Sequence, residues 1–308
     1  MRYRQLGRTG LTVSTISLGT VSLGLDYGIS APGQFGRPDE LSAIRLLRLA
    51  AERGVNFIDT APAYGTSERL VGCALGASQR VVIATKFTAP PDAANARDAI
   101  AASIEASRIA LARETLDILQ IHNATAALIG RADVMDALAD AKRRGDVRVL
   151  GASVYGEDNA LAVIQAGPFD VLQIAFNLLD QRMAARVLPA AVAAGVGVVV
   201  RSALLKGALS PKAQWLPGPL ERVRTAAEKA RDLLAGGSWE SLPKAAIRFC
   251  LSFPAIASVL TGARTAEELQ VALDAEAEGP LGDRELADAA ALGLDDESLI
   301  NPRDWPVP

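Results

Sequence analysis

The sequence has little of what metal sites and disulfide frameworks require. Its 308 residues include one histidine and two cysteines. Cys73 and Cys250 show no paired spacing, so we expect buried thiols of a reducing compartment and no disulfide. A single histidine with two scattered cysteines also predicts no bound metal.

The sequence also lacks long apolar runs and an excess of one charge. No run reaches the roughly 20 residues of a membrane span, and residues 1–5 lack the apolar core of a signal peptide. The formal net charge is −3, which argues against nucleic acid or an anionic membrane surface as partner. We therefore expect a cytoplasmic protein with neither kind of partner.

What the chain does contain is apolar residues, which make up 50% of it. This length and composition suffice for one large α/β domain or two small ones. No linker, low-complexity tract or charge block interrupts the sequence, so residues 1–308 are expected to form a single domain.

Short apolar runs alternate with amphipathic segments along most of the chain. The runs predict eight strands at 16–19, 55–59, 81–85, 116–121, 147–152, 171–176, 196–201 and 256–261. The intervening segments predict helices at 39–53, 67–75, 94–112, 131–144, 157–165, 182–194, 219–234 and 242–252, with a last one from 265. Eight βα units of this length predict a closed (β/α)₈ TIM barrel, preceded by a β-hairpin within residues 4–13. The runner-up is an open doubly wound sheet, but no Gly-x-Gly-x-x-Gly follows the first strand.

Three successive strands end in polar residues: Asp59, Lys86 and His122. Tyr64 follows Asp59 in the next turn. Each residue taken alone has an ordinary structural role, as a cap, a solvated lysine or a structural histidine. The C-terminal ends of barrel strands open on one face, where active sites lie, so their convergence favours a catalytic role.

The four side chains suit protonation of a carbonyl oxygen. A phenol is a poor acid at neutral pH, and a nearby ammonium favours its phenolate. Lys86 is the candidate cation, Asp59 would hold it charged, and His122 would donate an N–H to the substrate. General acid catalysis of this kind typically contributes about 10²–10⁴ in rate. Electrons must come from elsewhere, and a nicotinamide hydride fits.

Several motifs spread over nearly the whole chain together resemble those of the aldo-keto reductases. They are Leu6-Gly7-Arg8-Thr9-Gly10-Leu11-Thr12-Val13-Ser14, Leu18-Gly19-Thr20, Phe57-Ile58-Asp59-Thr60-Ala61-x-x-Tyr64-Gly65-x-Ser67-Glu68, Ala84-Thr85-Lys86, Leu119-Gln120-Ile121-His122 and Gly151-Ala152-Ser153. The resemblance implies a carbonyl reductase whose catalytic residues are Asp59, Tyr64, Lys86 and His122. It also implies an NADPH or NADP⁺ cofactor across the barrel mouth, with NADH possible, and a hairpin that caps the barrel bottom.

The same resemblance implies a set of cofactor-binding residues. They are Gly19, Thr20, Asp59, Ser153, Gln173, Ser202, Leu204, Gly207, Gly262, Arg264 and Glu268. Within this set, 202–207 would wrap the pyrophosphate and Arg264 would grip the ribose 2′-phosphate. The chain departs from the common pattern at Val154, where Asn is frequent, and at Glu268, where Gln is frequent.

Substrate specificity is expected from the loops at the barrel top. Their aromatic side chains give the candidates Tyr27, Phe87, Tyr155 and Trp215. If these line the pocket, they favour an apolar or sugar-like carbonyl over one that bears a carboxylate.

Two other functions are open on this fold. One is a cofactor-binding redox sensor or regulatory subunit with slow turnover. The other is a biosynthetic enzyme that uses its bound cofactor for net isomerisation.

Overall fold

Eight parallel strands close into a barrel in the computed structural model of the chain, which describes residues 1–33, 35–90 and 96–307. The strands are β3 (Ile16–Gly19), β4 (Phe57–Asp59), β5 (Val82–Phe87), β6 (Leu116–Ala124), β7 (Val147–Val154), β8 (Val171–Ala175), β9 (Gly197–Arg201) and β10 (Ile256–Gly262). Their order around the barrel follows the sequence, and β10 closes it by pairing with β3 and β9. The predicted TIM barrel is confirmed, and every predicted strand is present.

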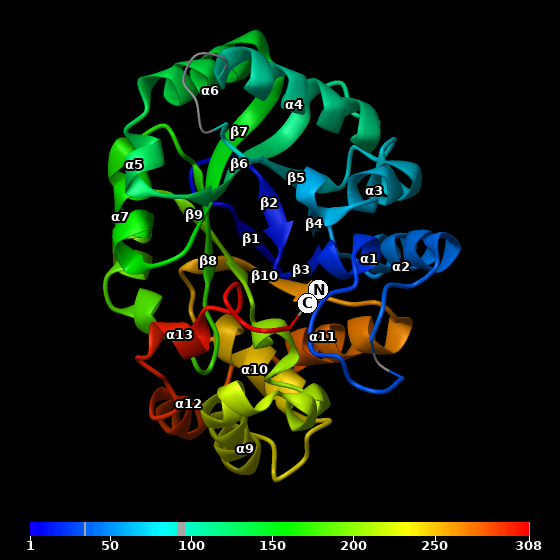
Figure 1. Ribbon diagram of the computed structural model, residues 1–308, viewed down its shortest axis with the longest axis vertical. Helices are drawn as coiled ribbons and strands as arrows, with labels where there is room; N and C mark the ends of the chain where they lie inside the picture. The colour runs from blue at the N-terminus through cyan, green and yellow to red at the C-terminus, as the bar shows by residue number, and fades with distance from the viewer. Residues whose placement is uncertain (34, 91–95, 308) are drawn as a thin grey trace.

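A ring of helices surrounds the strands (Figure 1). The helices that connect successive strands are α2 (Glu40–Glu52), α3 (Ser67–Leu75), α4 (Ala96–Leu111), α6 (Ala132–Arg144), α7 (Glu157–Ala166), α8 (Val187–Ala193) and α10 (Leu242–Leu251), and α11 (Ala266–Glu278) follows the last strand. Asp39 caps α2, as its side chain accepts a hydrogen bond from the Ser42 N–H at 2.9 Å. The predicted helix 94–112 is described from Ala96 onwards, and residues 94 and 95 lie outside the described part of the chain.

The chain adds further helices around the barrel top and the outer layer. They are α1 (Val21–Gly24), α5 (Ala126–Ile129), α9 (Glu221–Leu234), α12 (Asp283–Ala290) and α13 (Glu297–Ile300). Of these, α9 covers the predicted helix 219–234. No helix among the described residues is long and apolar enough to cross a membrane.

The N-terminal hairpin pairs β1 (Tyr3–Gln5) with β2 (Thr12–Ser14) in antiparallel register. Its apolar side chains pack on inward-facing residues near the N-terminal ends of the barrel strands. This inner core contains Leu6, Leu11, Val13, Phe57, Ala84, Ile118, Val149, Val171, Val199, Ala257 and Leu260. The hairpin therefore closes the barrel bottom, as expected.

Alternation along the strands decides which polar residues reach the barrel interior. Phe57, Ala84 and Ile118 belong to the inner core. Two positions later on the same strands stand Asp59, Lys86 and Gln120, and residues two apart share a face. The same rule places Gln173 above Val171 and Arg201 above Val199. A layer of polar side chains thus lies directly above the apolar filling of the barrel.

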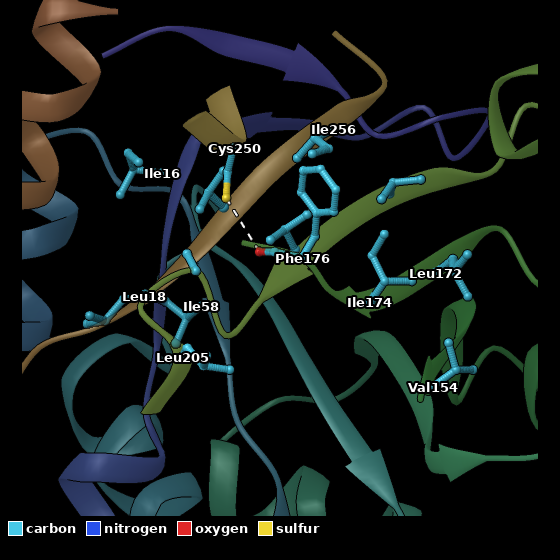
Figure 2. Packing of buried hydrophobic residues seen from close by; sticks show 14 of the residues in the cluster. Ile16, Leu18, Ile58, Val154, Leu172, Ile174, Phe176, Leu205, Cys250 and Ile256 are labelled. Atoms are coloured by element: carbon cyan, nitrogen blue, oxygen red, sulfur yellow. Dashed lines mark hydrogen bonds between the residues drawn. The ribbon is translucent and has the colours of Figure 1, made fainter. Parts of the chain in front are cut away.

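The larger core lies between the strands and the helices. Figure 2 shows part of it, with Ile58, Leu172 and Ile174 among the buried side chains. Cys250 is buried here, and its thiol donates a hydrogen bond to the Phe176 carbonyl at 3.5 Å. Both cysteines are free, but Cys73 is exposed, so the prediction of two buried thiols was wrong for Cys73. Its place on the outer face of α3 explains the exposure.

Candidate active site

A buried ion pair occupies the centre of the polar layer. Lys86 is 1% exposed and Asp59 is 2% exposed. The Lys86 ammonium donates to both oxygens of the Asp59 carboxylate, at 2.7 Å for Oδ2, and to the Thr60 carbonyl at 3.0 Å. Burial opposes the charge on Lys86, but Asp59 and then Tyr64 outweigh it, so the pKa of Lys86 lies above its usual range. Lys86 is therefore a permanent cation under the barrel mouth.

Two glutamines hold the Asp59 carboxylate in place. Its Oδ2 atom accepts hydrogen bonds from Nε2 of Gln173 at 2.9 Å and from Nε2 of Gln120 at 3.2 Å. Ser153 in turn donates to Oε1 of Gln173 at 3.3 Å. The carboxylate is thus saturated with donors, which fixes its orientation and that of Lys86.

Tyr64 reaches the ion pair from a short 3₁₀ helix, Pro62–Tyr64. The following residue, Gly65, has a φ of +61°, and a Cβ there would collide with the carbonyl of Gly24. This tight turn brings the Tyr64 ring to 4.9 Å from Nζ of Lys86. The ring also meets His122 edge-on, with ring centroids 5.9 Å apart. The four predicted catalytic residues therefore lie together.

His122 is neutral over the physiological range. Burial, and next the Lys86 ammonium, lower the pKa of His122 to about 4. Arg201 and Arg303 act in the same direction. A neutral imidazole can donate one N–H to a substrate oxygen without taking the proton meant for it.

A cavity of about 810 Å³ runs across the barrel mouth past Asp59, Tyr64 and His122. All the residues predicted to bind the cofactor line it: Gly19, Thr20, Asp59, Ser153, Gln173, Ser202, Leu204, Gly207, Gly262, Arg264 and Glu268. The structure thus brings these residues together around one cavity, and their contacts with a cofactor stay a prediction.

The segment that follows β9 along this cavity is conformationally strained. Ser202, Leu205 and Lys206 have φ values of +60°, +44° and +57°, and Gly207 has +104°. Left-handed conformations of non-glycine residues cost energy and cluster at ligand clamps. Successive turns of this kind also direct backbone N–H groups into concave surfaces that bind anions. The segment is therefore a candidate anion site, although the N–H groups of Leu205 and Gly207 already donate to the carbonyls of Ser202 and Leu204.

At the far end of the cavity, Arg264 is already paired. Its backbone N–H and its guanidinium both donate to Glu268, each at 2.8 Å. Lys212 lies 3.8 Å from the same carboxylate. Although burial opposes it, hydrogen bonding from Arg264 keeps the pKa of Glu268 below its usual range. Glu268 is a carboxylate within the expected phosphate site.

The four predicted substrate residues divide into two groups. Tyr27 and Tyr155 line the cavity, whereas Phe87 and Trp215 do not. Phe87 follows the inward-facing Lys86 on β5, so its side chain points outward into the strand–helix core. Trp215 is 44% exposed on a 3₁₀ helix, Pro211–Trp215. The placement of Phe87 and Trp215 in the pocket was therefore wrong.

Two residues of the site went unrecognised in the sequence. Gln120 stands two positions before His122 on the same strand face, so alternation alone would have placed it beside Asp59. Arg201 ends β9 as Asp59 ends β4, and it also lines the cavity. Like Asp59, Lys86 and His122, Arg201 follows an apolar run on a barrel strand.

Known proteins share both the sequence pattern and the fold. The aldo-keto reductase YhdN of Bacillus subtilis (strain 168) is 31% identical over 225 residues, which cover 69% of this chain and 65% of that protein. The NADH-specific methylglyoxal reductase of Escherichia coli (strain K12) is 27% identical over 310 residues, covering 88% of this chain and 92% of that protein. The holo form of aldo-keto reductase AKR11C1 from Bacillus halodurans superposes with a TM-score of 0.80 at 24% identity, covering 96% and 97% of the two chains.

The sequence signature of one family extends over almost all of the barrel. The sequence model of the Aldo/keto reductase family matches residues 15–293, from the start of β3 to beyond α12. This match includes the strand ends that carry Asp59, Lys86 and His122. Because the match covers nearly the whole chain, the chain belongs to the aldo/keto reductase family.

Proposed function

We propose that this protein is an NAD(P)H-dependent oxidoreductase that reduces an aldehyde or ketone, or oxidises the corresponding alcohol, with Tyr64 as general acid or base. The observation that carries the proposal is the meeting of Tyr64 and His122 above the buried Lys86–Asp59 pair. This set has proton donors for a carbonyl oxygen but no source of electrons of its own. A reduced nicotinamide supplies the hydride when bound.

Each residue has a distinct part in the proton transfer. Tyr64 gives its phenolic proton to the carbonyl oxygen as negative charge develops there. Lys86 stabilises the phenolate that remains, and Asp59 keeps Lys86 charged and oriented. Neutral His122 donates an N–H to the same carbonyl oxygen and so orients the substrate. In the oxidative direction the same residues act in reverse.

The cofactor assignment uses residues that surround the long cavity. Ser153 and Gln173 would hold the nicotinamide carboxamide, 202–207 the pyrophosphate, and Arg264 the ribose 2′-phosphate. We propose NADPH as the principal cofactor, because a guanidinium binds phosphate bidentately. NADH is the second candidate, since Glu268 competes for Arg264 and one relative is an NADH-specific reductase.

A cofactor-oxidation assay tests the proposal. Consumption of NADPH and of NADH is followed by absorbance with a panel of aldehydes and ketones that includes methylglyoxal, sugars and oxo acids. Stoichiometric turnover supports the reductase. Cofactor binding without turnover points to a redox sensor, and product formation without net oxidation points to an isomerase.

A further inference from the structure

Arg201 is a guanidinium fixed at the barrel mouth. Its Nη2 atom donates to the Val154 carbonyl at 3.0 Å, and its Nη1 atom donates to Oγ of Ser202 at 3.2 Å. The guanidinium lies 3.8 Å from the centre of the Tyr155 ring. These contacts with the end of β7 and with the residues that follow β7 and β9 hold the group in one orientation while it lines the cavity.

This cation has no counter-ion in the part of the chain that the structure describes. Among those residues, no carboxylate comes within 4.0 Å of Arg201, and none does of Arg303, which lines the same cavity. Arg264 and Lys212, which line the same cavity, lie against Glu268 instead. Lys206 also lines it without a carboxylate partner among the described residues, but its ammonium donates to the Val307 carbonyl at 2.7 Å and to the Pro302 carbonyl at 3.4 Å. A partly buried guanidinium with N–H groups to spare is a ready partner for an anion.

The positive charge of Arg201 acts on His122, which would face the reacting carbonyl. Arg201 and Arg303 both add to the effects that lower the pKa of His122, after burial and Lys86. Tyr27 lines the same cavity, and its ring centre lies 5.2 Å from Nζ of Lys206. Arg201 therefore shares one pocket with the proton donors.

We propose that Arg201 binds a carboxylate of the substrate, so that the enzyme acts on oxo acids, with Arg303 strengthening the same positive potential. The proposal rests on the proposed carbonyl reduction at Tyr64 and names its substrate class. It replaces the sequence-based expectation of an apolar or sugar-like carbonyl, which considered the aromatic residues of the loops and not the strand end.

A pair of isosteric aldehydes provides the test. 4-Carboxybenzaldehyde and 4-carbamoylbenzaldehyde carry the same reacting carbonyl and differ in charge at the far end. The ratio of their kcat/KM values cancels any effect of a substitution on folding, cofactor binding or hydride transfer. The ratio is measured for the wild type, Arg201→Met, Arg201→Lys and Arg303→Met. Arg45→Met, an exposed position on α2, is the matched control.

The wild type should favour the acid by about tenfold or more. Arg201→Met should bring the ratio close to one, Arg201→Lys should retain part of the preference, and Arg303→Met should lower it less. Arg45→Met should keep the wild-type ratio. An unchanged ratio in Arg201→Met would overturn the proposal. If the unchanged ratio is accompanied by a raised KM for the cofactor, Arg201 is a cofactor ligand instead.

Calorimetric titration with benzoate and benzamide repeats the comparison without turnover. Benzoate binding that depends on Arg201, in a protein that reduces neither aldehyde, would support the anion site and contradict the proposed reduction. Reduction of both aldehydes with no Arg201-dependent preference would do the reverse.

Discussion

Glu268 accepts hydrogen bonds from both the backbone N–H and the guanidinium of Arg264, each at 2.8 Å. The residue best suited to bind a 2′-phosphate is thus neutralised by a neighbour one helical turn away. A phosphate that entered this site would compete with Glu268 for Arg264 and would meet its negative charge. Cofactor preference should therefore depend on this pair.

Glu268→Gln should strengthen NADPH binding by about tenfold relative to NADH. The substitution removes the repulsion between Glu268 and the 2′-phosphate, and it releases Arg264 and Lys212 to bind that phosphate. A tenfold change in affinity corresponds to roughly 1.4 kcal/mol. Fluorescence titration of both cofactors measures the effect. Asp274→Asn, an exposed carboxylate on the same helix, controls for a general change in charge. Equal changes for NADPH and NADH would show that Glu268 does not meet the phosphate.

Arg264→Ala should weaken NADPH binding by about tenfold to a hundredfold and leave NADH nearly unchanged. Only NADPH carries the phosphate, and charge-assisted hydrogen bonds to it are worth about 1.5–3 kcal/mol. The same titration decides the matter. Wild-type binding of NADH that is tighter than that of NADPH would contradict the role given to Arg264.

Tyr64→Phe and Lys86→Met should each lower kcat by at least about a hundredfold, with cofactor affinity near wild type for Tyr64→Phe. The double variant should be little worse than either single one, because groups that act as a unit are not additive. Steady-state kinetics on all three variants test this. Retention of more than about a tenth of kcat in Tyr64→Phe would remove Tyr64 from the acid role, and additive losses would show independent action.

His122 should make the folded protein less stable in acid. Unfolded histidine takes up its proton near pH 6.5, whereas the pKa of folded His122 is about 4. Between these values the unfolded state binds more protons, so the free energy of unfolding falls as the pH falls through this window. The loss approaches roughly 3 kcal/mol. Urea titrations at about pH 7 and about pH 4.5 should show a larger drop for wild type than for His122→Asn, and equal drops would refute the shifted pKa.

The hairpin should be intolerant of any side chain at Gly7. This residue has a φ of +53°, and a Cβ there would strike the backbone of Gly195 and Gly197. Gly7→Ala should therefore cost more than about 1 kcal/mol of stability from the backbone conformation alone. Gly10 also has a positive φ of +75° but open space around it, so Gly10→Ala is the matched control. Thermal unfolding should rank Gly7→Ala well below Gly10→Ala.

The strand-end logic explains how much of the site could be predicted. Asp59, Lys86 and His122 each follow an apolar run, and parallel topology then brings them together. The alternation of side chains along a β-strand also decides which residues face the pocket, and the prediction for Phe87 neglected it. Phe87 faces away from the pocket because Lys86 faces into it, and Gln120 went unnoticed although it shares a face with His122.

Other features depend on contacts that periodicity does not encode. The pairing of Arg264 with Glu268 has the spacing of a helical ion pair, yet its hydrogen bonds arise from a cap geometry visible only in three dimensions. Helices α12 and α13 lie after the last barrel helix, where the βα alternation gives no guidance. The exposure of Cys73 depends on which face of α3 packs against the neighbouring helices.

In the part of the chain that the structure describes, the hairpin residues Leu6, Leu11 and Val13 fill the barrel bottom, so the cavity opens at the barrel mouth. If the proposed function holds, cofactor, substrate and product all pass through the mouth that holds Tyr64 and His122, and a cofactor bound along the cavity would obstruct the route of the product. Because product and cofactor would share this opening, we expect product release, and not hydride transfer, to be the rate-limiting step. Deuteration of the transferred hydrogen should then leave kcat almost unaffected while a single turnover slows, and a full isotope effect on kcat would place the slow event in the chemistry itself.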